Sequence, residues 1–245
     1  MRTRLLFSAV LFYCCPVLGQ KVIDITNADG YSIPDAQIAG MAGGQITSAV
    51  RYVKIKEGSP YFHEEWIKGA LITTDGKAYT KLDIRLNLLD DEVNYKDADG
   101  QEKIATTPLQ AVIIGDSAYG TKYVFIRGDK WSVTDRTLSS SWVQVLVNDK
   151  VSLVRQIKKN VKVTTPYGSS TDEEAIIDIE VYYLQISGQF IRIRDWDALP
   201  ILLQDKKDQV VQYIHSNHLR GRLPEEYAQV VSYYNSLISA VPAKK

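Results

Sequence analysis

The strongest constraint on the fold is a strand–turn–strand pattern that begins at Gly58 and recurs along most of the chain. In its first copy, an apolar segment leads to Asp75-Gly76, a dipeptide typical of hairpin turns, and then to residues 82–88, where apolar and polar side chains alternate. Such alternation indicates a strand with one buried and one exposed face. The sequence therefore predicts a mainly antiparallel β domain.

Further strands and turns follow up to about residue 194. A switch of the apolar phase near Tyr182-Tyr183 also predicts a β-bulge in one long strand. The predicted turns are Asp97–Gly100, Asn148-Asp149 and Ser187-Gly188, and the predicted strands lie at residues 51–56, 109–114, 123–126, 142–147, 151–157, 177–186 and 191–193.

The pattern becomes helical from about Asp195. Asp205 resembles the capped start of one helix, and Pro224 opens a second helix with an apolar stripe. We expect a curved sheet, a sandwich or a partial barrel, with two or three C-terminal helices packed on it in an α+β arrangement. The predicted divisions are a signal peptide (1–19), an irregular arm (20–47), the antiparallel β domain (48–194) and a helical segment (195–245) docked on the sheet.

The first residues have the features of a secretory signal peptide. Arg2 and Arg4 precede an apolar run that is too short for a membrane span, and cleavage after Gly19 would leave Gln20 as the new N-terminus. The alternative is a lipoprotein, but Tyr13 precedes Cys14 where a small residue is needed. We therefore expect an exported protein, periplasmic or extracellular, whose mature chain has no integral membrane span.

Export would also change the chemistry of the chain. Cys14 and Cys15 are its two cysteines, so the mature protein would contain neither disulfides nor thiol nucleophiles. Loss of Arg2 and Arg4 from 29 basic and 29 acidic residues leaves a small net negative charge. This balance indicates no nucleic-acid partner.

Catalytic and metal-binding motifs are incomplete. Gly115-Asp116-Ser117 after an apolar strand resembles the nucleophile block of the SGNH (GDSL-type) hydrolases, but the Asp-x-x-His motif of that family is missing. His215 and His218 could bind zinc with a third ligand from His63, Glu64 or Glu65, although the end of a helix explains both histidines more simply. The sequence therefore predicts no catalytic residue, no metal and no cofactor.

Aromatic side chains in a β-rich exported protein suggest a ligand-binding face, because they can stack on sugar rings or line an apolar pocket. The candidate residues for a glycan or apolar ligand are Tyr61, His63, Glu64, Trp131 and Tyr182. The turn that carries the first three residues could instead have a structural role, in which it fixes the entry to the first long hairpin. In that interpretation Trp66 is largely buried, with Tyr61 or Phe62 packed nearby.

Four short segments of the chain resemble a set of uncharacterised secreted β-rich proteins of Gram-negative bacteria. They are Gly-Ser-Pro-Tyr-Phe-x-Glu-Glu-Trp (58–66), Lys68-Gly69, Asp205-Lys206-Lys207 and Tyr233–Leu237. The resemblance implies a periplasmic or cell-surface location and brings no activity. We expect a non-enzymatic envelope protein that binds a partner protein, glycan or apolar ligand across a sheet face. The alternative is a small extracytoplasmic hydrolase with an acid-pair or histidine site that the sequence does not identify, and the oligomeric state stays open.

Overall fold

A computed structural model describes residues 44–46, 55–115, 122–131, 136–165, 167 and 173–239. The predicted signal peptide and residues 20–43 of the predicted arm lie outside the described residues. Residues 44–46 of that arm form a short strand against residues 103–105, so this part of the arm is not irregular. Asp116 and Ser117, which resemble a hydrolase motif, also lie outside the described residues.

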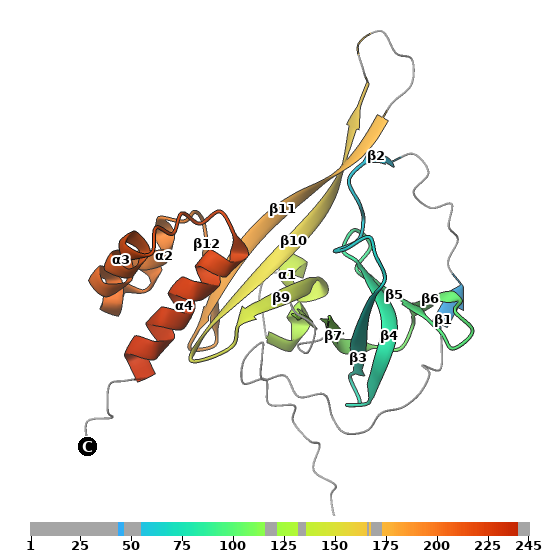
Figure 1. Cartoon of the computed structure of the whole chain (residues 1–245), viewed down its shortest axis with the longest axis horizontal. Helices are drawn as coiled ribbons and strands as arrows, with labels where there is room; N and C mark the ends of the chain where they lie inside the picture. The colour runs from blue at the N-terminus through green and yellow to red at the C-terminus, as the bar shows by residue number, and fades with distance from the viewer. Residues whose placement is uncertain are drawn as a thin grey trace, which may run out of the picture.

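The described strands form one sheet in the order β1-β6-β5-β4-β3-β7-β8-β9-β10-β11-β12, with β2 paired to β11 (Figure 1). Because β2 runs parallel to β11, the sheet is mixed and not purely antiparallel. It is also open, and neither a sandwich nor a barrel is established. In chain order the strands are β1 (Gly44–Ile46), β2 (Ile55–Glu57), β3 (Ile67–Thr73), β4 (Ala78–Asn87), β5 (Glu92–Lys96), β6 (Glu102–Ala105), β7 (Leu109–Ile114), β8 (Tyr123–Arg127), β9 (Trp142–Val147), β10 (Val151–Thr164), β11 (Glu173–Ile186) and β12 (Gln189–Ile193).

The helices are short except at the C-terminus. A 3-10 helix η1 (Gly128–Trp131) and α1 (Arg136–Ser140) lie between β8 and β9. After the last strand come α2 (Ala198–Leu202), the 3-10 helix η2 (Gln204–Lys206), α3 (Lys207–Ser216) and α4 (Pro224–Ser239). Figure 1 shows α2, α3 and α4 grouped at one end of β10 and β11, on the side away from β3–β6.

Local turn chemistry explains several of the hairpins. Ser187 (φ 50°) and Gly188 (φ 81°) both adopt the left-handed conformation and join β11 to β12 in two residues, which fits a type I′ turn. The Asp97 side chain accepts hydrogen bonds from the backbone N–H groups of Asp99 (3.0 Å) and Gln101 (2.9 Å) and so closes the β5–β6 turn. These turns were predicted at the same positions.

Both faces of the central strands carry buried apolar side chains. One cluster joins β7–β11 to Leu138 of α1, and a second joins the opposite face of β7–β9 to β4 and β5. The β4–β5 turn reaches β9, because Trp142 donates its indole N–H to the backbone carbonyl of Asp91 (3.3 Å). The sheet therefore coils so strongly that distant strands share one core.

The predicted bulge near Tyr182-Tyr183 is wrong. From Val151 to Thr164, β10 pairs with β11 without a register shift. Val181 and Tyr183 are buried in one core cluster, while Leu184 on the opposite face is buried beneath the C-terminal helices. Since both faces are covered here, consecutive apolar residues need no bulge.

The C-terminal helices pack on β9–β12 through one apolar cluster that includes Leu153, Leu184 and Val230. The predicted capping role of Asp205 is not observed, because α3 begins after Lys206 without a side-chain cap. Asp205 instead accepts a hydrogen bond from the Tyr234 hydroxyl (2.8 Å). It therefore links η2 to α4.

The β10–β11 hairpin extends beyond its neighbour β9, which pairs only with residues 153–156 of β10. From here on, the arm means the described residues from Lys158 to Ile179 of this hairpin, and not the predicted N-terminal segment 20–47. Figure 1 shows this arm projecting away from the rest of the sheet. The short strand β2 flanks the arm on its β11 side, at Glu174 and Ala175.

Candidate functional site

The Gly58–Trp66 turn continues the sheet beyond the end of β3. Phe62 donates its backbone N–H to the Leu86 carbonyl (2.8 Å), and Leu88 donates to the Pro60 carbonyl (2.9 Å). Strand-like alternation then directs Phe62 into the core, where its ring contacts Phe125 edge-on at 4.8 Å between centroids. The turn is thus anchored by backbone pairing and by one aromatic side chain.

Three of the predicted ligand-binding residues, Tyr61, His63 and Glu64, line one open cleft beside this turn. Lys159 of β10 and Asp178 of β11 also line the cleft, whose volume is about 440 Å³. The structure therefore brings these three residues together, next to charged groups that the sequence interpretation did not include.

His63 is a partly buried titratable group of the turn. Its ring contacts Phe62 at 4.3 Å and Tyr123 at 5.3 Å between centroids. Burial lowers the pKa of His63, nearby Lys159 and Arg155 lower it further, and Glu65 opposes them. The surroundings of His63 therefore favour its neutral form.

Trp66 is mostly but not completely buried, which agrees with the prediction that it is largely buried. The guanidinium of Arg85 lies 4.2 Å from the centroid of the Trp66 ring and 4.1 Å from that of Tyr61. Arg85 also forms an ion pair with Glu102 (2.9 Å). The Tyr61 and Trp66 rings therefore pack on the Arg85 guanidinium through cation–π contacts.

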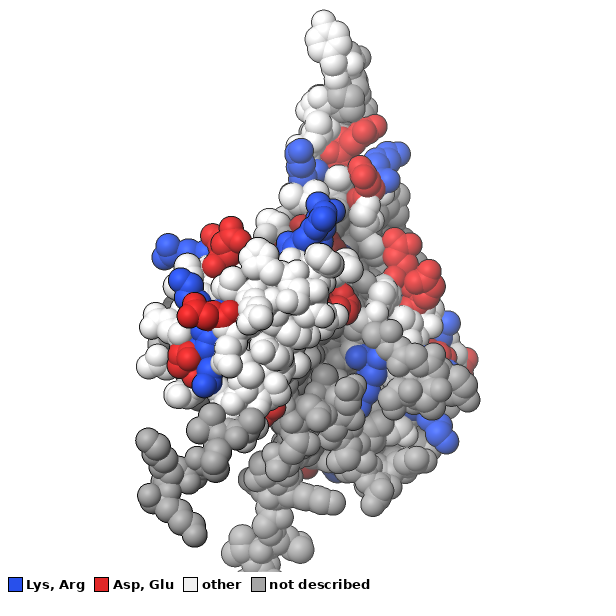
Figure 2. All heavy atoms as spheres, turned by 60° about the vertical axis from the view of Figure 1, so that its left-hand side comes forward, with Lys and Arg blue, Asp and Glu red and all other residues white. Residues whose placement is uncertain are grey.

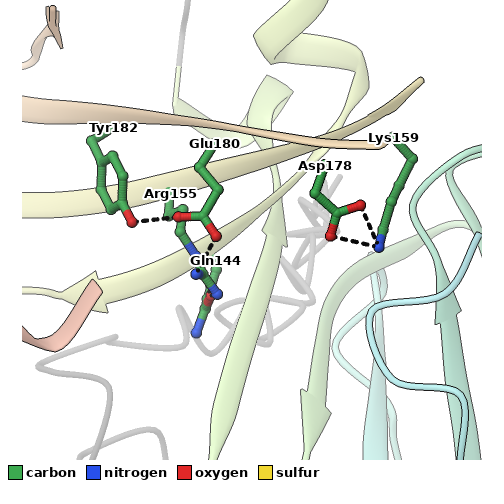
Figure 3. Close-up of polar contacts among 6 residues, drawn as sticks. All are labelled: Gln144, Arg155, Lys159, Asp178, Glu180 and Tyr182. Carbon is green, nitrogen blue, oxygen red and sulfur yellow. Dashed lines mark hydrogen bonds and ion pairs between the residues drawn. The ribbon is translucent and has the colours of Figure 1, made fainter. Parts of the chain in front are cut away.

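A polar ladder crosses β9, β10 and β11 on the face that also carries the cleft (Figure 3). Arg155, only 8% exposed, donates to Gln144 through Nη2 (2.6 Å) and to Glu180 through Nη1 (3.0 Å). Four residues further along β10, on the same face, Lys159 forms an ion pair with Asp178 at 2.8 Å. Sequence reasoning missed this ladder, although the charges replace apolar residues at alternate positions in both strands.

Tyr182, the fourth candidate, belongs to the ladder and not to the cleft. Its hydroxyl donates to Glu180 Oε2 (2.5 Å), and its ring stacks on Tyr227 of α4 with 4.1 Å between centroids. Burial and the hydrogen bond to Glu180 raise the pKa of Tyr182. The Tyr182 ring therefore forms part of the contact between the sheet and α4.

The fifth candidate, Trp131, is the last residue of η1, and its side chain lies outside the described part of the structure.

The ladder joins neighbouring strands, and its carboxylates are engaged by cations. Asp178 and Glu180 are each bound to a cation, and none of the three histidines has a side-chain hydrogen bond to another described residue. Among the described residues, no group of three His, Cys, Asp or Glu side chains could hold a metal ion. The polar contacts of the ladder are therefore of the kind that join neighbouring strands.

Within the described ranges, no helix combines the length and apolar character needed to cross a membrane. Comparisons of the chain with protein-family models, with curated proteins and with solved structures find no match.

Proposed function

We propose that the protein is an exported, non-enzymatic interaction module that binds a partner protein of the cell envelope through the β10–β11 arm. One observation carries this proposal: of the seven large apolar side chains that are exposed in the described structure, five lie on the arm. These five are Val161, Val163, Tyr167, Ile177 and Ile179. Exposed apolar groups gathered on one element are typical of protein interaction sites.

The arm offers two kinds of contact. Ile177 and Ile179 pair across the strands with Asn160 and Lys158, so they share one face of the hairpin, while Val161 lies on the other. Lys162 lies on the isoleucine face as well. Neither Lys158 nor Lys162 forms an ion pair with a described residue. This face therefore suits a partner segment that carries apolar residues and carboxylates.

The backbone of the arm supports the same proposal. Beyond Gln156, β10 has no neighbouring strand on its outer side within the described residues. An open edge can accept an extended segment by strand addition, and lysines on such an edge limit uncontrolled pairing. Figure 2 shows acidic and basic side chains on the flank of the arm.

Paired substitutions test the proposal. Ile177→Lys with Ile179→Lys should remove the apolar contact and repel other cations, because these side chains are 42% and 41% exposed. We expect a complex isolated from the envelope fraction after mild detergent treatment to lose its partner protein in this variant. Circular dichroism should show an unchanged fold, since both sites are exposed.

Matched control substitutions are available on the helices. Ile201 and Leu223 are 52% and 59% exposed, so Ile201→Lys with Leu223→Lys makes the same chemical change outside the arm. The control variant should retain the partner protein. Equal retention by both variants, or equal loss, would contradict binding through the arm.

A further inference from the structure

A second cleft, separate from the arm, lies among the C-terminal helices. Its volume is about 520 Å³, within the usual range for small-molecule sites of about 300–1,000 Å³. The cleft is lined by residues of α2, of α3 and of the segment that joins α3 to α4. Its apolar lining consists of Trp196, Pro200, Ile201, Val211, Ile214 and Leu219.

The charged and titratable lining of this cleft is mostly basic. Lys207, His215, His218 and Arg220 line it, against a single acid, Asp197. In the described part of the chain, no ion pair engages Lys207 or Arg220. An apolar floor beside unneutralised cations complements a molecule with an apolar body and an anionic head.

The local backbone fixes this cleft before any ligand binds. His218 adopts the left-handed conformation (φ 54°) where α3 ends, and Leu219 donates its N–H to the Ile214 carbonyl (3.1 Å). This is a Schellman-type end, at which glycine is the usual residue. A histidine at this position carries a conformational cost that glycine avoids, and it presents an imidazole to the cleft.

Gly221 holds the same segment against Trp196. A Cβ atom at Gly221 would lie 2.4 Å from the indole ring, so any other residue would displace the segment or the ring. Trp196 is in turn packed edge-on against Tyr227 of α4, with 4.8 Å between ring centroids. The wall of the cleft is therefore supported by α4 and needs little rearrangement on binding.

We propose that this cleft binds a single-chain anionic amphiphile, of which a free fatty-acid carboxylate is the simplest example. The apolar lining receives the chain, and Lys207 and Arg220 bind the carboxylate, with His218 beside them. This inference does not depend on the arm, because the two sites share no residue.

Isothermal titration of the purified full chain with dodecanoate, below its micelle concentration, tests the proposal. We expect saturable binding at a ratio of one to one. Lys207→Ala with Arg220→Ala should weaken it by about tenfold or more, because each cation would otherwise form a charge-assisted hydrogen bond. Lys206→Ala with Arg222→Ala is the matched control, since these neighbouring residues do not line the cleft. Its affinity should stay within about twofold of the parent.

A further variant, His218→Gly, separates binding from folding. It should raise the melting temperature, because glycine fits the left-handed position, and at the same time weaken dodecanoate binding. Absence of saturable dodecanoate binding would overturn the proposal. So would equal binding of dodecyltrimethylammonium, which has the same chain and the opposite charge, or an equal loss of affinity in the control pair. Binding of a short apolar peptide carboxylate without dodecanoate binding would also overturn it.

Discussion

One buried amide joins the C-terminal helix to the sheet, and its removal should be costly. Asn235 of α4, 2% exposed, accepts a hydrogen bond from the Val151 N–H (2.9 Å) and donates one to the Val151 carbonyl (2.8 Å). The side chain thus replaces a neighbouring strand at the first residue of β10. Asn235→Ala would leave both backbone groups of Val151 buried without these partners.

The expected loss follows from the two hydrogen bonds. Each buried group left unsatisfied costs about 1–3 kcal/mol, so we expect the free energy of unfolding to fall by about 3 kcal/mol. For a protein of this size, that corresponds to a fall in melting temperature of about 6–12 °C. Urea denaturation should show a lower midpoint with an unchanged slope, because the surface exposed on unfolding stays nearly the same.

Two further variants sharpen this test. Asn235→Asp at pH 7 keeps an acceptor for the Val151 N–H but places a negative charge against the Val151 carbonyl, so it should be at least as destabilising as alanine. Ser236→Ala changes the neighbouring exposed residue and should alter stability by less than about 0.5 kcal/mol. A loss below about 1 kcal/mol in Asn235→Ala would refute the anchoring role of this amide.

Two other predictions concern the turn and the pH dependence of stability. Phe62→Ala should cost about 3 kcal/mol, because the ring packs against the core cluster. Trp66→Ala should cost about 1–2 kcal/mol, because its ring packs on the Arg85 guanidinium and not against that cluster. Chemical denaturation that gives the reverse order would contradict this assignment. Burial and the hydrogen bond to Asp205 raise the pKa of Tyr234 to about 12, from about 10 in an unfolded chain. The contribution of Tyr234 to stability is therefore complete below about pH 10 and is lost as the pH rises toward about 12. Tyr234→Phe should make the free energy of unfolding depend less on pH between these values. An unchanged pH dependence in this variant would contradict the assignment.

Local features of the sequence predicted the elements better than their arrangement. The Ser187-Gly188 turn and the start of α4 at Pro224 depend on near neighbours, and both occur where expected. The pairing of β3 with β7 and of β2 with β11 joins distant segments. Alternation identifies a strand but does not choose its neighbour, so the sheet order could not be predicted.

The candidate sites show the same limit. Tyr61, His63 and Glu64 lie together because they are adjacent in sequence, but Lys159 and Asp178 join them only through the register of β10 and β11. Aromatic character predicted a largely buried Trp66, but not its contact with Arg85, because the turn meets β4 only in the folded sheet.

The arm gives a related example. Val161 and Ile177 follow the alternation of a half-buried strand, and they are exposed because the arm extends beyond the three core clusters. The alternation of a strand does not show which of its residues the core will cover.

Site-specific photo-crosslinking in cells tests the proposed role of the arm most directly. A photoreactive residue would replace Val163 or Ile177 on the arm, and Ile201 or Leu223 on the helices as matched exposed positions. Binding through the arm predicts one discrete adduct, with the same partner protein, from both arm positions and from neither helical position. Adducts of equal yield from all four positions, or from the helical positions alone, would contradict it.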